Sequence, residues 1–398
     1  MDIILYPKKL SGTVRAIPSK SQAHRLLICA AFADKPTTLV CPDTNRDIEA
    51  TADCLNALGA TATRTETGYQ VIPAAEIPGQ AVLNCCESGS TLRFMLPIAG
   101  ALGVDATFQM AGRLPLRPLS PLWEEMERMG CTLTRPTKDT IRCQGKLRCG
   151  EYTIDGGVSS QFITGLLFAA ALMEGQSKLT LTGKVESVPY ITMTRKAMSL
   201  FGVTSSGFVV NGGKKFRSPG ELTVEGDWSN SAFFLAAEAL GNDVTVDNLD
   251  PNSPQGDRAI VEYLSALQEK ATISAADTPD LVPILAVAAG ALHGAEFMDI
   301  QRLRLKETDR VATVLAMMDA LGAEASAAES NLTVSPAPFR SCTIDATGDH
   351  RIAMSAAIAA TVADGPVTIL GANSVNKSYP TFWAEYRRLG GEYELHVR

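Results

Sequence analysis

The chain has 398 residues, of which 45% are hydrophobic and 20% are charged, and its net charge is −7 at neutral pH. This length exceeds the usual size of one hydrophobic core, so we expect two domains, and the apolar content argues against intrinsic disorder. The negative charge argues against nucleic acid as a partner, because proteins that bind phosphate backbones carry basic patches. No apolar run reaches the roughly 18 residues of a membrane-spanning helix, so we expect no membrane span.

The cysteine and histidine content argues against disulfide and metal frameworks. The nine cysteines are odd in number and form no Cys-x-x-Cys pair, which is typical of reduced thiols in a cytosol. Four scattered histidines argue against a His-based metal site. The segment Met1–Leu5 lacks the basic leader and apolar stretch of a signal peptide. We therefore expect a cytoplasmic protein with no metal and no organic cofactor.

One kind of segment recurs along the chain: a small polar turn followed by an apolar, alanine-rich run of helical length. These runs are apolar on nearly all sides, so each is expected to form a buried helix. Most of them recur at intervals of about 70 residues, as expected for repeated supersecondary units. The turns that open them are Pro18–Arg25, Glu87–Thr91, Gly157–Gln161, Gly226–Ser231, Thr278–Asp280 and Gly348–Arg351.

Amphipathic helices and short β-prone runs fill the intervals. The expected helices each end at a glycine, the usual left-handed stop. They are Asp47–Leu58, Pro121–Met129, Ile191–Phe201 and Tyr379–Leu389. The expected strands are Thr37–Cys41, Tyr69–Ile72, Leu179–Thr182, Val244–Val246 and Val367–Leu370. One buried and one amphipathic helix per unit predicts an α/β fold of similar units, with helices packed inside a layer of sheets.

The stretch Leu303–Arg310 is rich in charge, lies between apolar segments, and directly precedes a helix expected at Val311–Leu321. A helix start attracts anions, because free backbone N–H groups and the positive end of the dipole point outward there. A solvated, well-capped helix start explains this stretch equally well on its own. However, charged groups also stand at the starts of other buried helices, where they need partners or ligands. The repetition favours an anion-binding function.

Ten motifs, in order, resemble those of the enolpyruvyl transferase family, and within it those of the 5-enolpyruvylshikimate-3-phosphate synthases. They cover almost the whole chain, and together they are highly specific. The motifs are Ser19-Lys20-Ser21-x-x-x-Arg25, Ser88-Gly89-Ser90-Thr91-x-Arg93, Arg113-x-x-x-Arg117-Pro118, Ser159-Ser160-Gln161-Phe162, Ser187-x-Pro189-Tyr190, Glu225-Gly226-Asp227, Pro279-Asp280, Leu303-Arg304-x-Lys306-Glu307-Thr308-Asp309-Arg310, Asp349-His350-Arg351-x-Ala353-Met354 and Lys377-Ser378-Tyr379-Pro380.

The resemblance implies a two-domain inverse, or inside-out, α/β barrel built from six βαββαβ repeats, three per domain. It places residues 19–225 in the first domain and residues 1–18 plus 226–398 in the second, with the active site in the cleft between them. Helix N-termini are expected to face this cleft, and closure on the substrates is the expected motion. Asp227 is expected to stabilise the domain crossing and Asp47 to cap its helix.

The resemblance further implies a transferase of the shikimate pathway, which leads to chorismate and the aromatic amino acids. The enzyme would move the enolpyruvyl group of phosphoenolpyruvate to the 5-hydroxyl of shikimate 3-phosphate and release phosphate. Both substrates carry a phosphate and a carboxylate, so a net-acidic protein must gather its cations locally. Phosphoenolpyruvate is expected to contact Lys20, Gly89, Arg117, Gln161, Arg310, Arg351 and Lys377. Shikimate 3-phosphate is expected to contact Lys20, Ser21, Arg25, Ser159, Ser160, Gln161, Ser187, Tyr190, Asp280 and Lys306.

The reaction removes a proton from a hydroxyl and adds one to a methylene carbon, so it needs groups with opposite tasks. We expect Asp280 to accept the hydroxyl proton and Glu307 to protonate the methylene. A neighbouring cation normally lowers a carboxyl pKa, which opposes an acid role for Glu307. Lys20 is the third candidate for proton transfer. The alternative for Glu307 is a simple ion pair with Arg304 or Arg310.

Structural roles stay open for other residues of the motifs. Gly89 also suits an ordinary turn, and Ser159 and Ser160 also suit helix caps. Tyr190 also suits a core aromatic with a tethered hydroxyl. His350 is expected to orient neighbours or fill the core rather than to act as a base.

Two positions depart from the family pattern. Glu87 stands where many members have Asn and would repel bound phosphoenolpyruvate, so we expect it to pair with an arginine or to point away. Arg302 replaces an Asn that contacts shikimate 3-phosphate in many members, and that contact is therefore not carried over.

Three other functions match the sequence less well. UDP-N-acetylglucosamine enolpyruvyl transferase shares the fold, but it carries a loop cysteine near Arg113–Ser120, where this chain has none, and Lys-Asn in place of Lys20-Ser21. A non-catalytic anion-binding repeat homologue is disfavoured because Asp280 and Glu307 are present. RNA phosphate cyclases have related repeats, but a net-acidic chain suits RNA poorly. We expect small-molecule substrates, no nucleic acid, no membrane, and a monomer.

Overall fold

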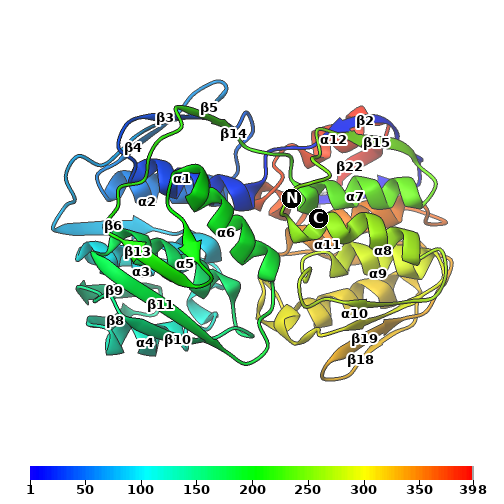
Figure 1. The fold of residues 1–398 in the computed structure, drawn as a ribbon. Coiled ribbons are helices and arrows are strands. Elements are labelled where there is room, and N and C mark those ends of the chain that lie inside the picture. Colours follow the sequence, from blue (N-terminus) through cyan, green and yellow to red (C-terminus); the bar gives the residue numbers. More distant parts are fainter. Residues whose placement is uncertain (397–398) are drawn as a thin grey trace. The chain divides into compact units, whose positions relative to one another are not determined.

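The computed structural model describes residues 1–396, and the chain divides into two compact units (Figure 1). One joins Met1–Ile17 to Gly226–Arg398 and is called here the terminal unit; the other, Pro18–Glu225, is called the central unit. No helix in the described range is long and apolar enough to cross a membrane.

The central unit contains three four-stranded sheets that share one topology. In each, a parallel pair is extended by an antiparallel hairpin, in the orders β14-β3-β5-β4, β6-β7-β9-β8 and β10-β11-β13-β12. The strands are β3 (Thr37–Val40), β4 (Thr61–Arg64), β5 (Gly68–Ile72), β6 (Gln80–Asn84), β7 (Asp105–Gln109), β8 (Cys131–Thr137), β9 (Thr140–Gly145), β10 (Glu151–Asp155), β11 (Gly175–Thr182), β12 (Ser205–Ser206), β13 (Val209–Gly212) and β14 (Glu221–Thr223).

The terminal unit has two sheets with the same strand directions, in the orders β20-β21-β1-β22 and β16-β17-β19-β18, and adds the two-stranded parallel sheet β15-β2. In the first sheet the antiparallel strands β1 and β22 come from opposite ends of the chain instead of from a hairpin. The N-terminal strands therefore pair with strands from the second half of the chain. The strands are β1 (Asp2–Tyr6), β2 (Ser11–Arg15), β15 (Asp243–Asp247), β16 (Ala271–Ser274), β17 (Ala295–Met298), β18 (Ala325–Ala327), β19 (Asn331–Val334), β20 (Cys342–Asp345), β21 (Val367–Leu370) and β22 (Glu392–His396).

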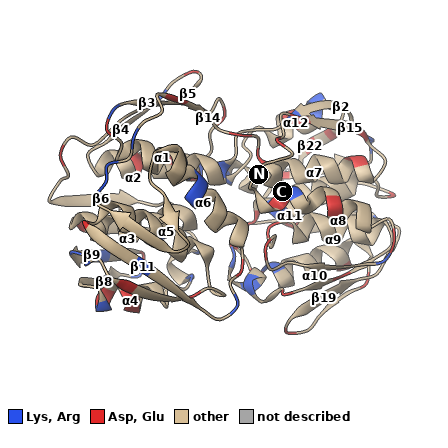
Figure 2. Ribbon diagram, in the orientation of Figure 1, with Lys and Arg blue, Asp and Glu red and all other residues tan. Residues whose placement is uncertain are grey.

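All six of the expected buried helices form, and they fill the two cores. Helices α5 and α9 contain no charged residue, which Figure 2 shows as uncoloured ribbon. The buried helices are α1 (Lys20–Ala31), α3 (Gly89–Leu102) and α5 (Ser160–Leu172) in the central unit, and α7 (Trp228–Ala239), α9 (Val282–Ala291) and α11 (His350–Ala360) in the terminal unit. Their length and apolar composition explain why the sequence pattern alone located them.

The expected amphipathic helices also form, with small shifts at their ends. The helix expected from Tyr379 begins at Phe382 instead, because the residue before Pro380 is driven away from the helical region. The helix expected at Val311–Leu321 begins one residue earlier, with Asp309 as its cap. The remaining helices are α2 (Arg46–Ala57), α4 (Leu122–Arg128), α6 (Val188–Leu200), α8 (Ile260–Ala266), α10 (Arg310–Leu321) and α12 (Phe382–Arg388).

Close packing of α3 on α5 fixes the middle of the central unit. A Cβ added at Gly165 would lie 2.3 Å from the backbone oxygen of Arg93 and 2.8 Å from Cγ of Pro97. Only glycine permits this approach, since the obstruction includes backbone. The start of α5 is therefore held at a fixed place beside the start of α3.

Candidate active site

Three buried helices of the central unit begin at serine caps. The side chains of Ser19, Ser88 and Ser159 each accept a hydrogen bond from a backbone N–H of the following turn. Ser159 thus caps α5, as the structural alternative for this residue predicted, whereas Ser160 is the first residue of the helix. Free N–H groups at such helix starts favour anions.

Lys20, at the start of α1, is held by a carboxylate of α2. Its Nζ lies 3.0 Å from Oδ2 of Asp47, and both side chains are largely buried. Asp47 was expected to cap α2, and that prediction is wrong: Asn45 is the cap, and its side chain accepts from Ile48 N. Asp47 lies in the first turn, where the ion pair fixes the Lys20 ammonium.

Arg25 ties α1 to α6 from a buried position. Its Nε donates to Thr194 Oγ1 at 2.8 Å, and its two Nη atoms donate to the carbonyl oxygens of Ser21 at 2.6 Å and Tyr190 at 3.1 Å. Burial lowers the pKa of Arg25 to about 10, which leaves it charged at neutral pH. Ser187 precedes α6 with a left-handed φ of 56° and is buried. The backbones of Ser21 and Tyr190, two predicted contacts for shikimate 3-phosphate, are therefore held by one guanidinium.

Gly89 opens α3 directly against Arg117. A Cβ added at Gly89 would lie 2.6 Å from Nη1 of Arg117 and 3.1 Å from Nη1 of Arg93. The missing side chain of Gly89 therefore leaves room for a guanidinium. Arg93 then donates to Gln161 Oε1 at 2.7 Å and to the carbonyl oxygen of Pro118 at 3.0 Å. Gly89, Arg117 and Gln161, all predicted to contact phosphoenolpyruvate, are thereby joined.

In the terminal unit, Arg310 is the centre of a network of carboxylates. Its guanidinium is almost fully buried and contacts Asp349 at 3.0 Å, Asp280 at 2.5 Å and Glu307 at 2.7 Å. The expected alternative for Glu307, an ion pair with Arg310, is therefore present. Neighbouring carboxylates raise the pKa of Arg310 against the effect of its burial.

Asp280 is surrounded by cations on three sides. Besides Arg310, its carboxylate contacts Nζ of Lys306 at 3.2 Å and Nη2 of Arg351 at 3.4 Å. Burial alone would raise the pKa of Asp280, but Arg351, Lys306 and Arg310 together hold it well below its usual range. The group is therefore ionised and able to accept a proton, although its basicity is reduced while the cations remain in place.

Lys306 is the cation of this network whose charge depends on pH near neutrality. Burial lowers its pKa to about 8, opposed by the nearby Asp280 and reinforced by Arg310 and Arg302. Lys306 is a cation at pH 7 and loses its charge above about pH 8.

Sequence reasoning missed Asp257, a buried carboxylate in the 3-10 helix η2 (Gly256–Ala259). Burial and nearby Asp280 raise its pKa to about 6, against the opposing effects of Arg351 and Ser229. Neither carboxylate oxygen has a hydrogen bond of normal length, so Ser229 is a weak partner. The Ser229 hydroxyl instead accepts from Arg351 Nη2 at 2.8 Å. No local motif signals this residue, because its neighbours come from distant segments.

Comparison with known proteins assigns the family. The sequence model of EPSP synthase (3-phosphoshikimate 1-carboxyvinyltransferase) matches residues 4–386. Relatives named 3-phosphoshikimate 1-carboxyvinyltransferase from Clostridium kluyveri and Clostridium beijerinckii are each 35% identical to this chain, over 98% of the chain and 98% of the relative. The chain belongs to the EPSP synthase family.

Solved structures agree with the family fold. An EPSP synthase structure from Acinetobacter baumannii has a TM-score of 0.81 at 22% identity, covering 99% of this chain and 100% of that one. The enolpyruvyl transferase NikO from Streptomyces tendae has a TM-score of 0.75 at 16% identity, over 99% and 98% of the two chains. The expected two-domain, inside-out α/β class is therefore confirmed, whereas the count of six repeats stays a prediction, since β15-β2 has only two strands.

Two residues depart from the EPSP synthase pattern expected from the sequence. Glu87 is exposed and lies against Gly112, where an added Cβ would stand 2.8 Å from its carboxyl carbon. Arg302 lies in the 3-10 helix η3 (Gln301–Leu305) and acts electrostatically on Lys306. The Glu87 side chain thus packs against the loop that leads to Arg117.

Other residues of the EPSP synthase motifs take positions around α11 and α7. Lys377 is nearly buried at the end of the 3-10 helix η4 (Ala372–Lys377), which packs on α11. His350 is buried in the first turn of α11. Asp227 caps α7 and accepts from Asn230 N. Among the described residues, no group of three His, Cys, Asp or Glu side chains is arranged to hold a metal ion.

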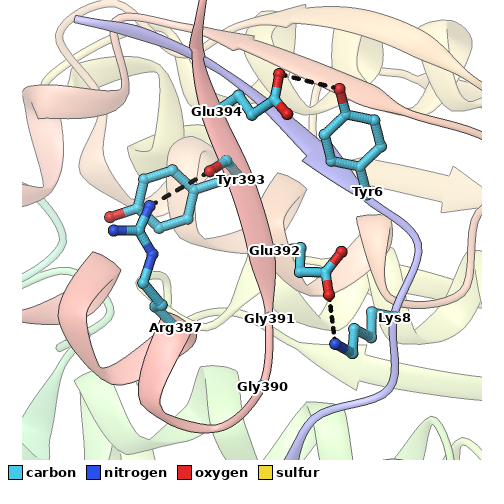
Figure 3. Close-up of a pocket in the computed structure, with 8 residues that line it drawn as sticks. All are labelled: Tyr6, Lys8, Arg387, Gly390, Gly391, Glu392, Tyr393 and Glu394. Atoms are coloured by element: carbon cyan, nitrogen blue, oxygen red, sulfur yellow. Dashed lines mark hydrogen bonds and ion pairs between the residues drawn. The ribbon is translucent and has the colours of Figure 1, made fainter.

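A surface hollow in the terminal unit holds none of the predicted site residues (Figure 3). It lies between β1, β22 and the end of α12. Lys8 pairs with Glu392, Tyr6 donates to Glu394, and Arg387 stacks on the Tyr393 ring and donates to its carbonyl oxygen. The hollow therefore offers no set of uncompensated cations for an anionic substrate.

Proposed function

We propose that this chain transfers the enolpyruvyl group of phosphoenolpyruvate to the 5-hydroxyl of shikimate 3-phosphate and releases phosphate. The observation that carries the proposal is the match, over 98% of both lengths, to relatives named for this reaction at 35% identity. The clusters of arginine and lysine at buried helix starts in both units support it, because both substrates are dianionic or more.

The residue assignments follow the two units. In the central unit, Gly89, Arg117 and Gln161 would bind phosphoenolpyruvate, while Ser21, Arg25, Ser159, Ser160, Ser187 and Tyr190 would bind shikimate 3-phosphate, with Lys20 touching both. In the terminal unit, Arg310, Arg351 and Lys377 would bind phosphoenolpyruvate, and Lys306 and Asp280 would bind shikimate 3-phosphate. We propose that both sets serve one reaction, in a site formed by the two units.

The chemistry requires two proton transfers before phosphate leaves. The 5-hydroxyl loses a proton as its oxygen bonds to C2 of phosphoenolpyruvate, and the methylene carbon gains one. Phosphate and a methyl proton then leave, which restores the double bond of the enolpyruvyl group. Asp280, ionised among cations, would accept the hydroxyl proton, and Glu307 would protonate the methylene, with Lys20 as the third candidate. Bound anions would offset the positive charge of Arg310, which lies 2.7 Å from the Glu307 carboxylate.

The test is ³¹P NMR of the purified protein with phosphoenolpyruvate and one acceptor at a time. Inorganic phosphate and a new phosphorylated product should appear with shikimate 3-phosphate, and neither should appear with UDP-N-acetylglucosamine or without an acceptor. Phosphate release with UDP-N-acetylglucosamine would assign the sister activity. No release from folded protein with either acceptor would mean that the motifs bind anions without catalysis.

We further infer a monomer in the cytoplasm. All nine cysteines are free, as expected for a reducing compartment, and seven of them are partly or fully buried. Light scattering during size-exclusion chromatography should give the mass of one 42.3 kDa chain. A mass of two chains would overturn the monomer.

A further inference from the structure

A chain of hydrogen bonds links three helices beneath the first turns of α1, α2 and α3. His24 Nδ1 lies 2.7 Å from Thr51 Oγ1, which lies 2.7 Å from Thr91 Oγ1, which donates to Ser88 Oγ at 2.7 Å. All four side chains are at most 1% exposed. Ser88 is the cap of α3 and directly precedes Gly89. A buried series of polar groups thus ends at the turn that faces Arg117.

The polarity of the series follows from counting hydrogens. Each hydroxyl has one hydrogen to donate, and Thr91 gives its hydrogen to Ser88 or to the carbonyl oxygen of Asp47, 3.4 Å away. Thr51 must then donate to Thr91 and accept from His24, so the His24 proton lies on Nδ1. Nε2 of His24 is buried and makes no hydrogen bond among the described residues. This agrees with the Nδ1–H tautomer, in which Nε2 has no hydrogen to donate. The opposite polarity would bury an N–H without an acceptor, which is costly.

His24 also stands among residues already assigned to the site. The centroids of the His24 and Phe94 rings lie 6.2 Å apart in an edge-on arrangement. The Arg25 guanidinium stacks on the same Phe94 ring, with its carbon 5.3 Å from the ring centroid. The charged groups that act on its ring are Asp47, Lys20 and Arg25. Burial lowers the pKa of His24 to about 3. Asp47 opposes this shift, whereas Lys20 and Arg25 reinforce it, so the ring stays neutral and the series keeps one polarity.

We propose that His24, Thr51 and Thr91 form a positioning relay that fixes the first turn of α3, with Gly89, relative to the first turns of α1 and α2. The relay holds the backbone N–H groups of that turn at the distance a bound phosphoenolpyruvate requires. The proposal rests on the proposed binding of phosphoenolpyruvate at Gly89. None of the three side chains touches substrate, so their effect appears in the binding of phosphoenolpyruvate.

The kinetic test compares Thr51→Val with Thr37→Val. Both exchanges keep the side-chain shape and remove one buried hydroxyl, but Thr37 pairs with Ser218 at 2.7 Å on β3, away from the relay. Thr51→Val should raise KM for phosphoenolpyruvate about tenfold. The KM for shikimate 3-phosphate should stay within about twofold of the Thr37→Val value. Equal KM values for phosphoenolpyruvate in the two variants would overturn the relay.

Two further measurements keep the test decisive if Thr51→Val folds poorly. His24→Asn retains an N–H donor near the Nδ1 position and should keep KM for phosphoenolpyruvate close to that of the wild type, whereas His24→Ala should raise it. In the wild type, ¹⁵N NMR should show His24 with a protonated Nδ1 and a bare Nε2 from pH 5 to pH 8. An Nε2–H tautomer or a charged ring in that range would overturn the proposal. If Gly89→Ala leaves this KM unchanged while the NMR signature holds, the assigned phosphoenolpyruvate site fails instead.

Discussion

At Gly89, a single added methyl group would collide with a charged neighbour. The Cβ of alanine would stand 2.6 Å from Nη1 of Arg117, so the guanidinium must move. We expect Gly89→Ala to raise KM for phosphoenolpyruvate about tenfold or more, because the site loses both the anion contact and the close backbone approach. Steady-state kinetics with each substrate varied in turn measures this effect.

The control for Gly89 is Gly79, in an exposed loop of the same unit. A Cβ there meets nothing within 4 Å. Gly79→Ala should leave both KM values unchanged, and an equal rise in the two variants would exclude a specific role for Gly89.

The lowered pKa of Lys306 predicts that binding of shikimate 3-phosphate depends on pH. Its pKa of about 8 means that the free enzyme holds a cation there below pH 8 and a neutral amine above it. The kcat/KM for shikimate 3-phosphate should therefore fall above about pH 8. Lys306→Arg keeps the charge at every accessible pH, so this alkaline limb should move to higher pH. A limb that stays in place in Lys306→Arg would show that another group causes it.

Glu307 is assigned to proton transfer although it pairs with Arg310. Glu307→Gln keeps an acceptor for Arg310, which also retains Asp349 and Asp280, so the fold should persist. We expect kcat to fall about 100-fold or more while both KM values change little. Glu329→Gln, at an exposed position of the same unit, is the matched control. Full turnover in Glu307→Gln would leave only its structural ion pair.

The starts of the buried helices position the candidate site, and their packing is exacting. A Cβ at Gly165 of α5 would meet the Arg93 backbone at 2.3 Å, whereas one at Gly290 of α9 would meet the flexible end of Met318 at 2.5 Å and the Phe339 ring only at 3.1 Å. We expect Gly165→Ala to lower the free energy of unfolding by about 3 kcal/mol, and Gly290→Ala by about 1 kcal/mol, because methionine can move aside. Urea unfolding measures both, and equal losses would contradict the packing argument.

The sequence predicted the buried helices well and the site geometry only in part. Long apolar runs such as α5 and α9 are recognisable from the sequence alone. The hairpin of β8 and β9 was not predicted, because β8 is largely exposed and alternates between buried and exposed residues only at its start. The motifs predicted the residues of the site, but not the residues with which they form ion pairs and hydrogen bonds. The pair of Lys20 and Asp47 spans 27 positions of sequence. Asp257 and Arg351, which interact electrostatically, lie still further apart in the sequence.

In the whole molecule, the proposed site residues are divided between two compact units. Each unit holds its own set of buried cations at helix starts, and the proposed reaction needs both sets. The family assignment accounts for this division, because its members share the two-domain fold. If one unit alone bound the substrates, the cations of the other unit would have no anionic substrate to bind.

Hydrogen–deuterium exchange of the full chain, with and without an equilibrium mixture of phosphoenolpyruvate and shikimate 3-phosphate, shows which unit the substrates protect. Ligands that bind the folded state slow local opening by mass action. We predict slower exchange at the starts of α1, α3 and α5 in the central unit, and at residues 303–312 and the start of α11 in the terminal unit. Protection confined to one unit would contradict the claim that both serve a single site.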